Sequence, residues 1–314
     1  MIKETEDFLN KYNIQNKTVI AAFSAGPDSC CLALILNKLK EKYNLNIILA
    51  YFNHGWRKEA NDEEEFTKNF AQKLNLKYII QKAPKEAEKT EEKARELRYI
   101  FLENAAKENN SDVVFLAHNK NDNVETIIYR IIKGTSIKGT RAIQEKREIY
   151  FRPLLNIEKK EILKYLKENN QKYMIDNSNE ETKYKRNYIR KEILPLFEKI
   201  NPNYLNSINN FAKMCILAQD IIDDKINEIK GCLIKNNIIN KKIYTSLKEP
   251  YRLEILNDFL GEKLKYRDYK TIKKLDNFIL NNITSKTSLN KFEFLKVKKD
   301  KIFIENSIKG EDNE

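Results

Sequence analysis

The chain contains few residues that break regular structure. Its 314 residues include only seven glycines, six prolines and one tryptophan. This scarcity excludes a flexible low-complexity linker, because such linkers are rich in glycine or proline. The length exceeds the usual size of a single hydrophobic core, so two domains are expected. Composition does not mark their boundary. A change in pattern places it near Asn210, which gives domains 1–210 and 211–314.

Cysteine and histidine are also scarce. The four cysteines, Cys30, Cys31, Cys215 and Cys232, form neither a Cys-x-x-Cys motif nor any spacing typical of zinc ligands. The chain has two histidines, His54 and His118. A structural metal site is therefore not expected, and the cysteines are interpreted as buried free thiols.

Long apolar runs are absent as well. No run approaches the roughly 20 residues that a membrane-spanning helix needs. The first seven residues, Met-Ile-Lys-Glu-Thr-Glu-Asp, are acidic and lack the apolar core of a signal peptide. We therefore expect a cytoplasmic protein without a membrane partner.

Positive charge is in excess, with a formal net charge of +12 and a pI near 9.2. This balance favours polyanionic partners through long-range attraction and counterion release. The alternative interpretation is that a lysine-rich composition reflects the base usage of the genome. Charge alone does not decide between the two.

The first half of the chain alternates short apolar runs with longer charged stretches. The apolar runs, which predict buried strands, are residues 19–23, 47–51, 78–80 and 113–117. The helix-length segments near them are about 28–43, 60–75, 86–109 and 122–133. This order predicts an α/β fold with a doubly wound, mostly parallel sheet. Ligands of such sheets bind at the carboxyl ends of the strands.

Beyond residue 200 the pattern is that of a smaller, mainly helical domain. Residues 205–233 have helical periodicity, and residues 241–280 predict further short helices. Residues 287–305 alternate apolar and polar side chains, which predicts a small β segment.

A loop of small and polar residues follows the first apolar run. It consists of Ser24, Ala25, Gly26, Pro27, Asp28 and Ser29. The N–H groups and dipole of the helix that begins here favour an anion, Gly26 lets the backbone approach it, and the two serine hydroxyls can donate to it. Because Gly-Lys-Ser/Thr is missing, this is not the cradle used for γ-phosphate transfer. Taken alone, the loop could also be an ordinary strand-to-helix turn.

The loop resembles the pyrophosphate loop of N-type ATP pyrophosphatases, Ser-Gly-Gly-x-Asp-Ser. The resemblance implies an enzyme that binds ATP, lets a substrate oxygen attack the α-phosphate, and releases pyrophosphate. Ala25 departs from the motif, and its methyl group is expected to strain a tightly wrapped loop slightly.

Two further motifs resemble those of the tRNA(Ile)-lysidine synthases, a family within these pyrophosphatases. Residues 53–57 resemble Asn-His-x-x-Arg, and residues 91–99 resemble Glu-x-x-Ala-Arg-x-x-Arg-Tyr. Arg95 and Arg98 are three residues apart, so they share a helix face that can meet phosphate. A solvated helix face is the alternative interpretation of this pair.

Residues 117–126 resemble the Ala-His-His-x-x-Asp-x-x-Glu-Thr motif of the same family, with Asn119 in place of the second histidine. Asp122 and Glu125 are three apart on the expected helix, so both carboxylates point the same way. Such a pair can bind a ligand ammonium or a magnesium ion. A role in capping the helix is the alternative for Asp122.

The last match begins at residues 152–155, Arg-Pro-Leu-Leu. It continues through Asp-x-x-Asn at 176–179 to Arg-Asn-x-x-Arg at 186–190. Basic residues interleaved with tyrosines suit contact with RNA, because guanidinium groups meet phosphate and rings stack on bases. The five matches occur in the family's order, which makes the resemblance specific for the first two thirds of the chain.

The resemblance implies that the chain activates the wobble cytidine of the isoleucine tRNA with a CAU anticodon and joins free L-lysine to it. ATP and Mg²⁺ are the expected cofactors. The sequence leaves undecided whether the chain forms a homodimer. Catalytic roles are implied for Asp28, Arg95 and His118. ATP is expected to contact the loop 24–29 together with His54, Arg57 and Arg186, and Asp28 is the expected Mg²⁺ ligand.

Asp122 and Glu125 are expected to hold the substrate lysine. Contacts with tRNA are expected from basic residues in both domains, namely Arg98, Lys185, Arg190, Lys263, Lys265, Arg267, Lys270 and Lys274. For the basic run in the C-terminal domain, a solvated helix face is the alternative.

Three other functions are open. A tRNA thiolase of the same fold needs a reactive cysteine or an iron–sulfur cluster, and the cysteine spacing offers neither. An NAD-synthetase type of enzyme would not need two basic, tyrosine-containing segments. A tRNA-binding relative without activity is supported by Ala25, Asn119 and Ser136, whereas Asp28 and the acidic pair Asp122 and Glu125 argue against it.

Overall fold

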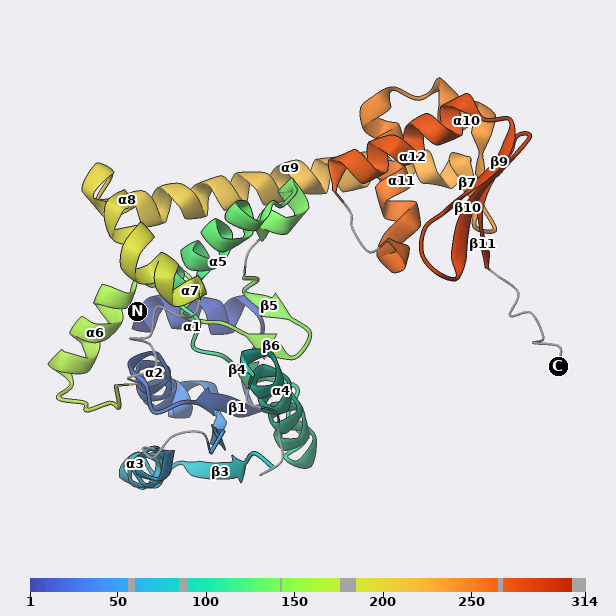
Figure 1. Cartoon of the computed structure of the whole chain (residues 1–314). Helices are drawn as coiled ribbons and strands as arrows, with labels where there is room; N and C mark the ends of the chain where they lie inside the picture. Colours follow the sequence, from blue (N-terminus) through green and yellow to red (C-terminus); the bar gives the residue numbers. More distant parts are fainter. Residues whose placement is uncertain are drawn as a thin grey trace. The chain divides into compact units, whose positions relative to one another are not determined.

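The structure is a computed structural model that describes residues 1–55, 60–84, 88, 90–141, 143–175, 185–264 and 268–306. The chain divides into two compact units, Met1–Ile216 and Leu217–Glu314. The division lies within one continuous helix, α9 (Tyr204–Leu233) (Figure 1). A helical connection needs no glycine or proline, which accounts for the lack of a linker-like composition. In the described part of the chain, every helix is too short or too polar to cross a membrane.

The first unit is built on a six-stranded sheet with the order β3-β2-β1-β4-β6-β5. Its strands are β1 (Thr18–Phe23), β2 (Asn46–Asn53), β3 (Lys77–Lys82), β4 (Val114–Phe115), β5 (Lys146–Arg147) and β6 (Tyr150–Phe151). Only β5 is antiparallel to its neighbour. The predicted α/β fold with a mostly parallel sheet is confirmed. The short hairpin of β5 and β6 was not expected, because two-residue strands give no apolar run.

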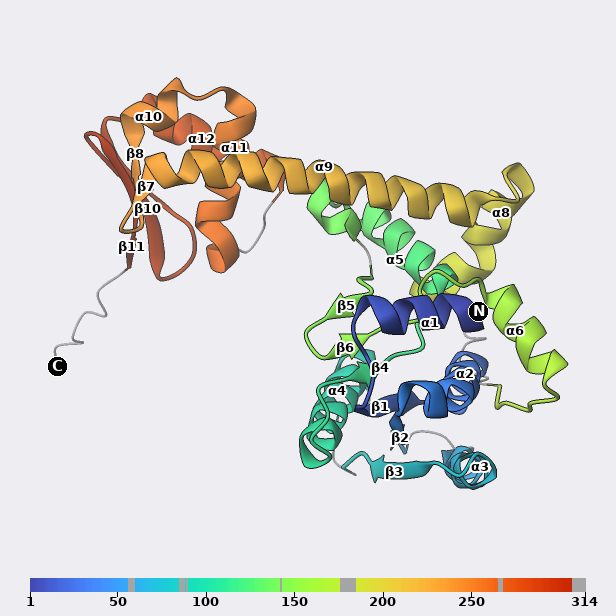
Figure 2. The same cartoon turned by 180° about the vertical axis from the view of Figure 1, so that it is seen from behind.

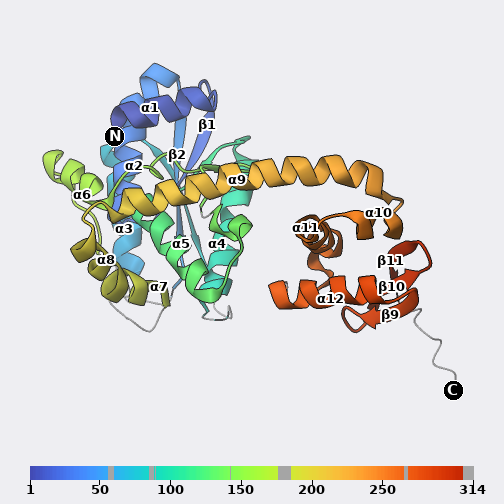
Figure 3. The ribbon, with the colours of Figure 1, turned by 90° about the horizontal axis from the view of Figure 1, so that it is seen from above.

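Helices cover both faces of this sheet. Those of the first unit are α1 (Ile2–Lys11), α2 (Pro27–Tyr43), α3 (Ala60–Lys73), α4 (Glu91–Glu108), α5 (Lys120–Lys133), α6 (Lys159–Glu168), α7 (Lys185–Tyr188) and α8 (Leu194–Ile200), with the short 3-10 and π turns η1 (Ile137–Arg141) and η3 (Ile189–Ile193). Helices α1, α2, α3 and α6 share one core with the sheet, and α4 packs on the opposite face (Figure 3). Helix α5 packs against η3, α8 and the start of α9.

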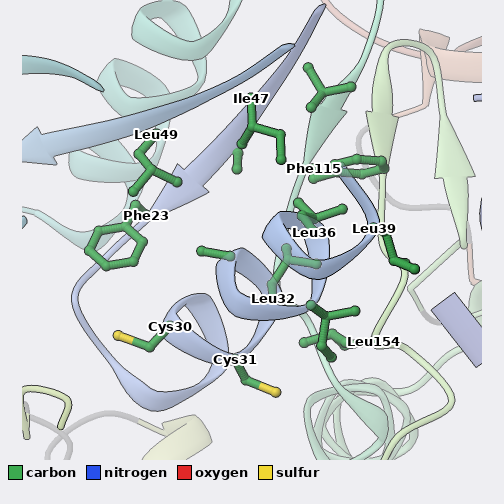
Figure 4. Packing of buried hydrophobic residues seen from close by; sticks show 14 of the residues in the cluster. Phe23, Cys30, Cys31, Leu32, Leu36, Leu39, Ile47, Leu49, Phe115 and Leu154 are labelled. Atoms are coloured by element: carbon green, nitrogen blue, oxygen red, sulfur yellow. The ribbon is translucent and has the colours of Figure 1, made fainter. Parts of the chain in front are cut away.

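Strands β1, β2 and β4 are mainly apolar because both of their faces are buried. Successive residues of β1 alternate between the two cores: Val19 and Ala21 pack with α2, whereas Ile20 packs with α4. Figure 4 shows the first core, where Leu32 and Leu36 of α2 lie near Phe115 of β4. Two buried faces explain why the apolar runs of β1, β2 and β4 show no alternation with polar residues.

The second unit combines short helices with a five-stranded antiparallel sheet of order β7-β8-β11-β10-β9 (Figure 2). Its elements are β7 (Ile234–Lys235), β8 (Ile238–Asn240), α10 (Lys241–Ser246), α11 (Glu249–Leu260), η4 (Gly261–Lys263), α12 (Tyr269–Asn281), β9 (Thr284–Ser288), β10 (Glu293–Lys298) and β11 (Lys301–Asn306). Its core contains Ile255 and Leu256 of α11 together with Leu295 of β10. The predicted small β segment is the hairpin of β10 and β11 together with β9.

Candidate active site

The order of the strands creates a switch point at β1. From β1 the chain continues to β2 and β3 on one side, whereas β4 pairs with β1 on the other side. The loops that leave the carboxyl ends of β1 and β4 therefore lie next to each other, which is where sheets of this type bind ligands. Their contact is direct, because the side-chain amide Nδ2 of Asn119 donates to Asp28 Oδ1 over 3.0 Å.

The loop after β1 is held in a defined shape by its own polar groups. The Ser29 hydroxyl accepts a hydrogen bond from the backbone N–H of Ser24 at 3.2 Å and donates to the carbonyl of Gly26 at 3.0 Å. The carbonyl of Ala25 accepts from the N–H of Met174 at 2.9 Å. Ser29 thus organises the loop, and its hydroxyl also lies 3.3 Å from that of Ser24, an exposed residue.

Ala25, rather than Gly26, has the unusual backbone. Its φ is +58°, in the left-handed region, and its side chain is fully buried. Gly26 has a φ of −74°, and an added Cβ would meet Ser24 Oγ at 3.4 Å, an ordinary contact. The first glycine of the Ser-Gly-Gly-x-Asp-Ser motif is therefore the one that this loop conformation favours.

Helix α2 begins directly after the loop with Pro27, and its N-cap residue is Gly26, which provides no side-chain cap. The N–H groups of the first turn therefore face the loop without a capping side chain in front of them. Together with the helix dipole they form a site suited to a phosphate group.

Asp28 lies where three elements meet. In addition to its contact with Asn119, its Oδ2 accepts from Nζ of Lys159 at 2.6 Å. Lys159 is the first residue of α6. Sequence analysis missed Lys159, since it is far from Asp28 in the chain and follows the Arg-Pro-Leu-Leu motif without belonging to it.

Asn119 and Asp122 cap helix α5 reciprocally. Asn119 Oδ1 accepts from the N–H of Asp122 at 3.1 Å, and Asp122 Oδ2 accepts from the N–H of Asn119 at 2.9 Å. The capping alternative for Asp122 is thus observed, and Asn119 uses its amide oxygen for the cap and its NH₂ group for Asp28. Burial raises the pKa of Asp122 to about 6, assisted by the nearby charges of Glu125 and Asp28.

Glu125 is buried one turn further along α5. It accepts two hydrogen bonds from Arg190, from Nε at 2.7 Å and from Nη2 at 2.8 Å. Arg190 Nη2 also lies 3.8 Å from Asp122 Oδ1. The guanidinium group of Arg190 therefore contacts both carboxylates of the acidic pair that the resemblance assigns to the substrate lysine. The predicted roles of Glu125 in lysine binding and of Arg190 in tRNA binding stay predictions.

The other candidates of the first unit lie around the same edge of the sheet. His54 follows β2, with its ring 4.8 Å from that of Phe52, and the half-buried His118 follows β4. Arg95 is exposed on α4, where it stacks over the ring of Tyr99 at 5.0 Å and donates to its hydroxyl at 3.2 Å. Arg98 is exposed on the same helix.

The basic candidates beyond residue 180 differ in exposure and in whether they form an ion pair. Lys185, Lys270 and Lys274 are exposed, and Lys263 pairs with Glu293. Lys270 and Lys274 line a shallow hollow on α12 with Tyr269, Lys273 and Asn277. Three candidates, Arg57, Lys265 and Arg267, lie outside the described residues, as does the side chain of Arg186.

The polar groups at the switch point fit a nucleotide and its magnesium ion. The uncapped N–H groups of α2 suit the phosphates, and the partly exposed carboxylate of Asp28 is a ligand that Mg²⁺ accepts beside phosphate oxygens. Asp28 would hold the ion, with Asn119 orienting its other oxygen.

A family model described as a PP-loop domain, whose name marks it as ATP-binding, matches residues 1–197. The chain belongs to the PP-loop family. This confirms the resemblance that the loop 24–29 indicated. It also identifies the first unit as an ATP-binding domain.

Curated relatives are similar to much of this PP-loop protein. A tRNA(Ile)-lysidine synthase of Thermosipho africanus is 35% identical over 238 residues, which is 72% of this chain and 56% of the relative. The tRNA(Ile)-lysidine synthase of Pseudothermotoga lettingae is 40% identical over 197 residues, 61% of this chain and 44% of the relative. The chain thus spans about half the length of the curated relatives it matches.

A solved structure supports the fold. The U34-tRNA thiolase NcsA of Methanococcus maripaludis, described with its [4Fe-4S] cluster, superimposes with a TM-score of 0.56. The match covers 68% of this chain and 77% of the thiolase, at 18% identity. At this identity the likeness concerns the fold alone.

Proposed function

We propose that this PP-loop protein is a tRNA(Ile)-lysidine synthase, which uses ATP to join free L-lysine to C2 of the wobble cytidine in the isoleucine tRNA with a CAU anticodon. The names of its relatives and the five motifs support the proposal. The observation that carries it is the position of an acidic pair, Asp122 and Glu125, at the start of α5. Asn119 connects that helix directly to Asp28 of the phosphate loop.

The proposed chemistry has two steps. In the first, the C2 oxygen of cytosine attacks the α-phosphate of ATP, the bond to pyrophosphate breaks, and AMP becomes attached to the base. The N–H groups at the start of α2 and the hydroxyl of Ser24 would hold the departing pyrophosphate. Asp28 would hold Mg²⁺, which supplies positive charge to the phosphates. The cytidine must leave its stack to reach this loop, as enzymes that act on bases require.

In the second step, the ε-amine of lysine attacks C2, the bond between C2 and the oxygen of AMP breaks, and the amine loses a proton. Asp122 and Glu125 would bind the other ammonium group of the lysine. Since Arg190 now pairs with Glu125, the lysine has to share this carboxylate or replace the guanidinium. Burial raises the pKa of Asp122 to about 6, so lysine binding should weaken as the pH falls below that value.

The thiolase alternative is disfavoured by the environment of the cysteines near the loop. Cys30 and Cys31 are buried at the start of α2. Burial raises the pKa of both thiols, that of Cys31 to about 12. Neither is a thiolate at neutral pH, and thiolates are the reactive form. Cys215 is buried on α9, and Cys232 is exposed on the same helix.

The direct test uses radiolabelled lysine, ATP and a transcript of the tRNA with a CAU anticodon, scored for acid-precipitable label. We expect incorporation that depends on ATP and is lost with Asp28→Ala. A transcript with uridine at the wobble position is the matched control and should stay unlabelled. Pyrophosphate release without lysine incorporation would favour another PP-loop reaction. Binding of tRNA without any turnover would favour an inactive relative.

The two steps can be separated with Glu125→Gln, which removes a carboxylate but leaves the phosphate loop unchanged. We expect the KM for lysine to rise, while attachment of AMP to the tRNA continues and the adenylated tRNA accumulates. Equal loss of both steps would contradict a role for Glu125 in holding lysine.

A further inference from the structure

The ion pair between Lys159 and Asp28 lies at the end of the phosphate loop, where α2 begins. The Lys159 side chain is 32% exposed and that of Asp28 is 27% exposed, so solvent and ligands reach both groups. The pair joins the first residue of α6 to the first turn of α2.

The position of Lys159 is fixed by its own backbone. Its N–H donates to Oδ1 of Asn121 in the first turn of α5 at 3.0 Å. The neighbouring Lys160 differs sharply, since it is 79% exposed and pairs with Glu158 at 2.7 Å. Of these two adjacent lysines, Lys159 contacts the phosphate loop, and α6 begins at the point that brings it there.

When the nucleotide binds with Mg²⁺, the metal ion and the ammonium group of Lys159 compete for Oδ2 of Asp28. Asp28 is the residue that would hold Mg²⁺, yet its Oδ2 accepts from Lys159 and its Oδ1 accepts from Asn119. An ammonium on a flexible four-carbon stem can move by a few ångströms at little cost, and triphosphate oxygens are strong acceptors for it.

We propose that Lys159 is a phosphate-binding residue of this site. It pairs with Asp28 in this structure and moves to the β- or γ-phosphate of ATP when the nucleotide binds with Mg²⁺. The positive charge of Lys159 then balances the negative charge of the departing pyrophosphate. The inference rests on the proposed function only in one respect, namely that the site binds ATP. The alternative PP-loop reactions require ATP as well.

The test is calorimetric binding of a non-hydrolysable ATP analogue at saturating Mg²⁺ to the full chain. Lys159→Gln should weaken binding by about tenfold to a hundredfold, the usual effect of losing a hydrogen bond to a charged group. Lys159→Arg should restore most of the affinity. Lys160→Gln is the matched control on the same helix and should bind like the unchanged protein.

Pyrophosphate and AMP, measured separately, locate the effect. Lys159→Gln should weaken the binding of pyrophosphate and leave that of AMP unchanged. If Lys159 is merely a counter-ion of Asp28, its removal frees Asp28 for Mg²⁺, and the analogue will bind equally well or more tightly, which overturns the inference. Thermal unfolding of each variant checks the fold, and Lys159→Met, which keeps the apolar stem, replaces the glutamine variant if that one unfolds. Failure of lysine incorporation in the unchanged protein would reject the proposed function without touching this result.

Discussion

At residue 25 the chain places an alanine where φ is +58° and the side chain has no exposed surface. A left-handed conformation costs a residue other than glycine about 1–2 kcal/mol. Burial of the methyl group returns part of this cost, roughly 0.8 kcal/mol. The alanine is therefore tolerated. The strain expected from the sequence arises from the positive φ of Ala25.

Substitutions at this position should separate strain from packing. We expect Ala25→Gly to change the free energy of unfolding by less than about 1 kcal/mol, because relief of strain is offset by the greater flexibility of the unfolded chain and by the lost methyl group. Ala25→Val should destabilise the protein by more than about 2 kcal/mol, because a β-branched residue fits this conformation poorly and the site is filled. Urea denaturation measures both. Equal stabilities of the two variants would contradict the strained backbone.

Asp122 gives a prediction about pH. Burial raises its pKa to about 6 in the folded protein, whereas the unfolded chain has the usual value near ~4. The folded state thus holds the proton more tightly, so the contribution of this group to stability is complete below pH ~4 and is lost as the pH rises through about 6. Asp122→Asn, which keeps an oxygen for the cap, should therefore gain stability relative to the unchanged protein between these two values.

The measurement for Asp122 is urea denaturation of both proteins at several pH values. Asp112 offers a control of opposite sign, because a hydrogen bond from Lys17 holds the pKa of that carboxyl below its usual range. Its contribution is present above the usual pKa and is lost as the pH falls. The effect of Asp112→Asn should be small, since its side chain is largely exposed. A stability difference for Asp122→Asn that does not vary with pH would refute the assignment.

At the scale of elements, helix α5 is fastened to η3 by the pair of Glu125 and Arg190, beside an apolar cluster that includes Val124 and Ile189. Glu125 is buried, whereas the Arg190 side chain is 41% exposed. Removing the arginine alone leaves a buried charge without this partner, which is the costly way to break such a pair.

A double-mutant cycle tests this contact. Arg190→Gln should destabilise the protein by about 2 kcal/mol or more, since it strips a buried charge of two hydrogen bonds. In combination with Glu125→Gln, part of that loss should be recovered, because residue 125 then carries no charge. Urea denaturation of the four proteins gives the coupling energy. Additive effects would mean that the two side chains do not stabilise each other.

At the scale of the whole molecule, the second unit is proposed to bind the body of the tRNA through exposed lysines. Cutting the chain at residue 210 is a poor test, because the break falls within α9 and removes Ala212, which packs against Ile127 of α5. Substitutions on α12 are cleaner, since Lys270 and Lys274 are exposed and the buried face of that helix stays unchanged.

Lys270→Ala combined with Lys274→Ala should weaken tRNA binding and reduce its dependence on salt by about one to two units of slope, because each phosphate contact releases counterions. Binding is measured at three or more salt concentrations. The control replaces Lys225 and Lys230, which pair with Glu228 and Asp258. The same slope in the α12 variant and in the unchanged protein would mean that these lysines form only a solvated face.

The sequence by itself determined the α/β fold and the position of the phosphate loop. Strands buried on both faces are apolar throughout, and a strand, a loop of small residues and a helix start are contiguous in the chain, so local pattern is enough to find them. The helices and the hairpin of β10 and β11 in the second unit were also predicted from local patterns, the helices from helical periodicity and the hairpin from alternation of apolar and polar residues. The two-residue strands β5 and β6 were missed because pairing with a neighbour, rather than a local pattern, defines them.

Only the tertiary structure decided which charged groups share the site. The contact of Lys159 with Asp28 joins residues 131 positions apart, and that of Arg190 with Glu125 spans 65. The composition and periodicity of the sequence are the same whether a charged side chain faces solvent or a carboxylate. The partner of that side chain is set by the packing of α6 against α2 and of η3 against α5. The motifs placed acidic and basic residues near the loop, and the fold selected the pairs among them.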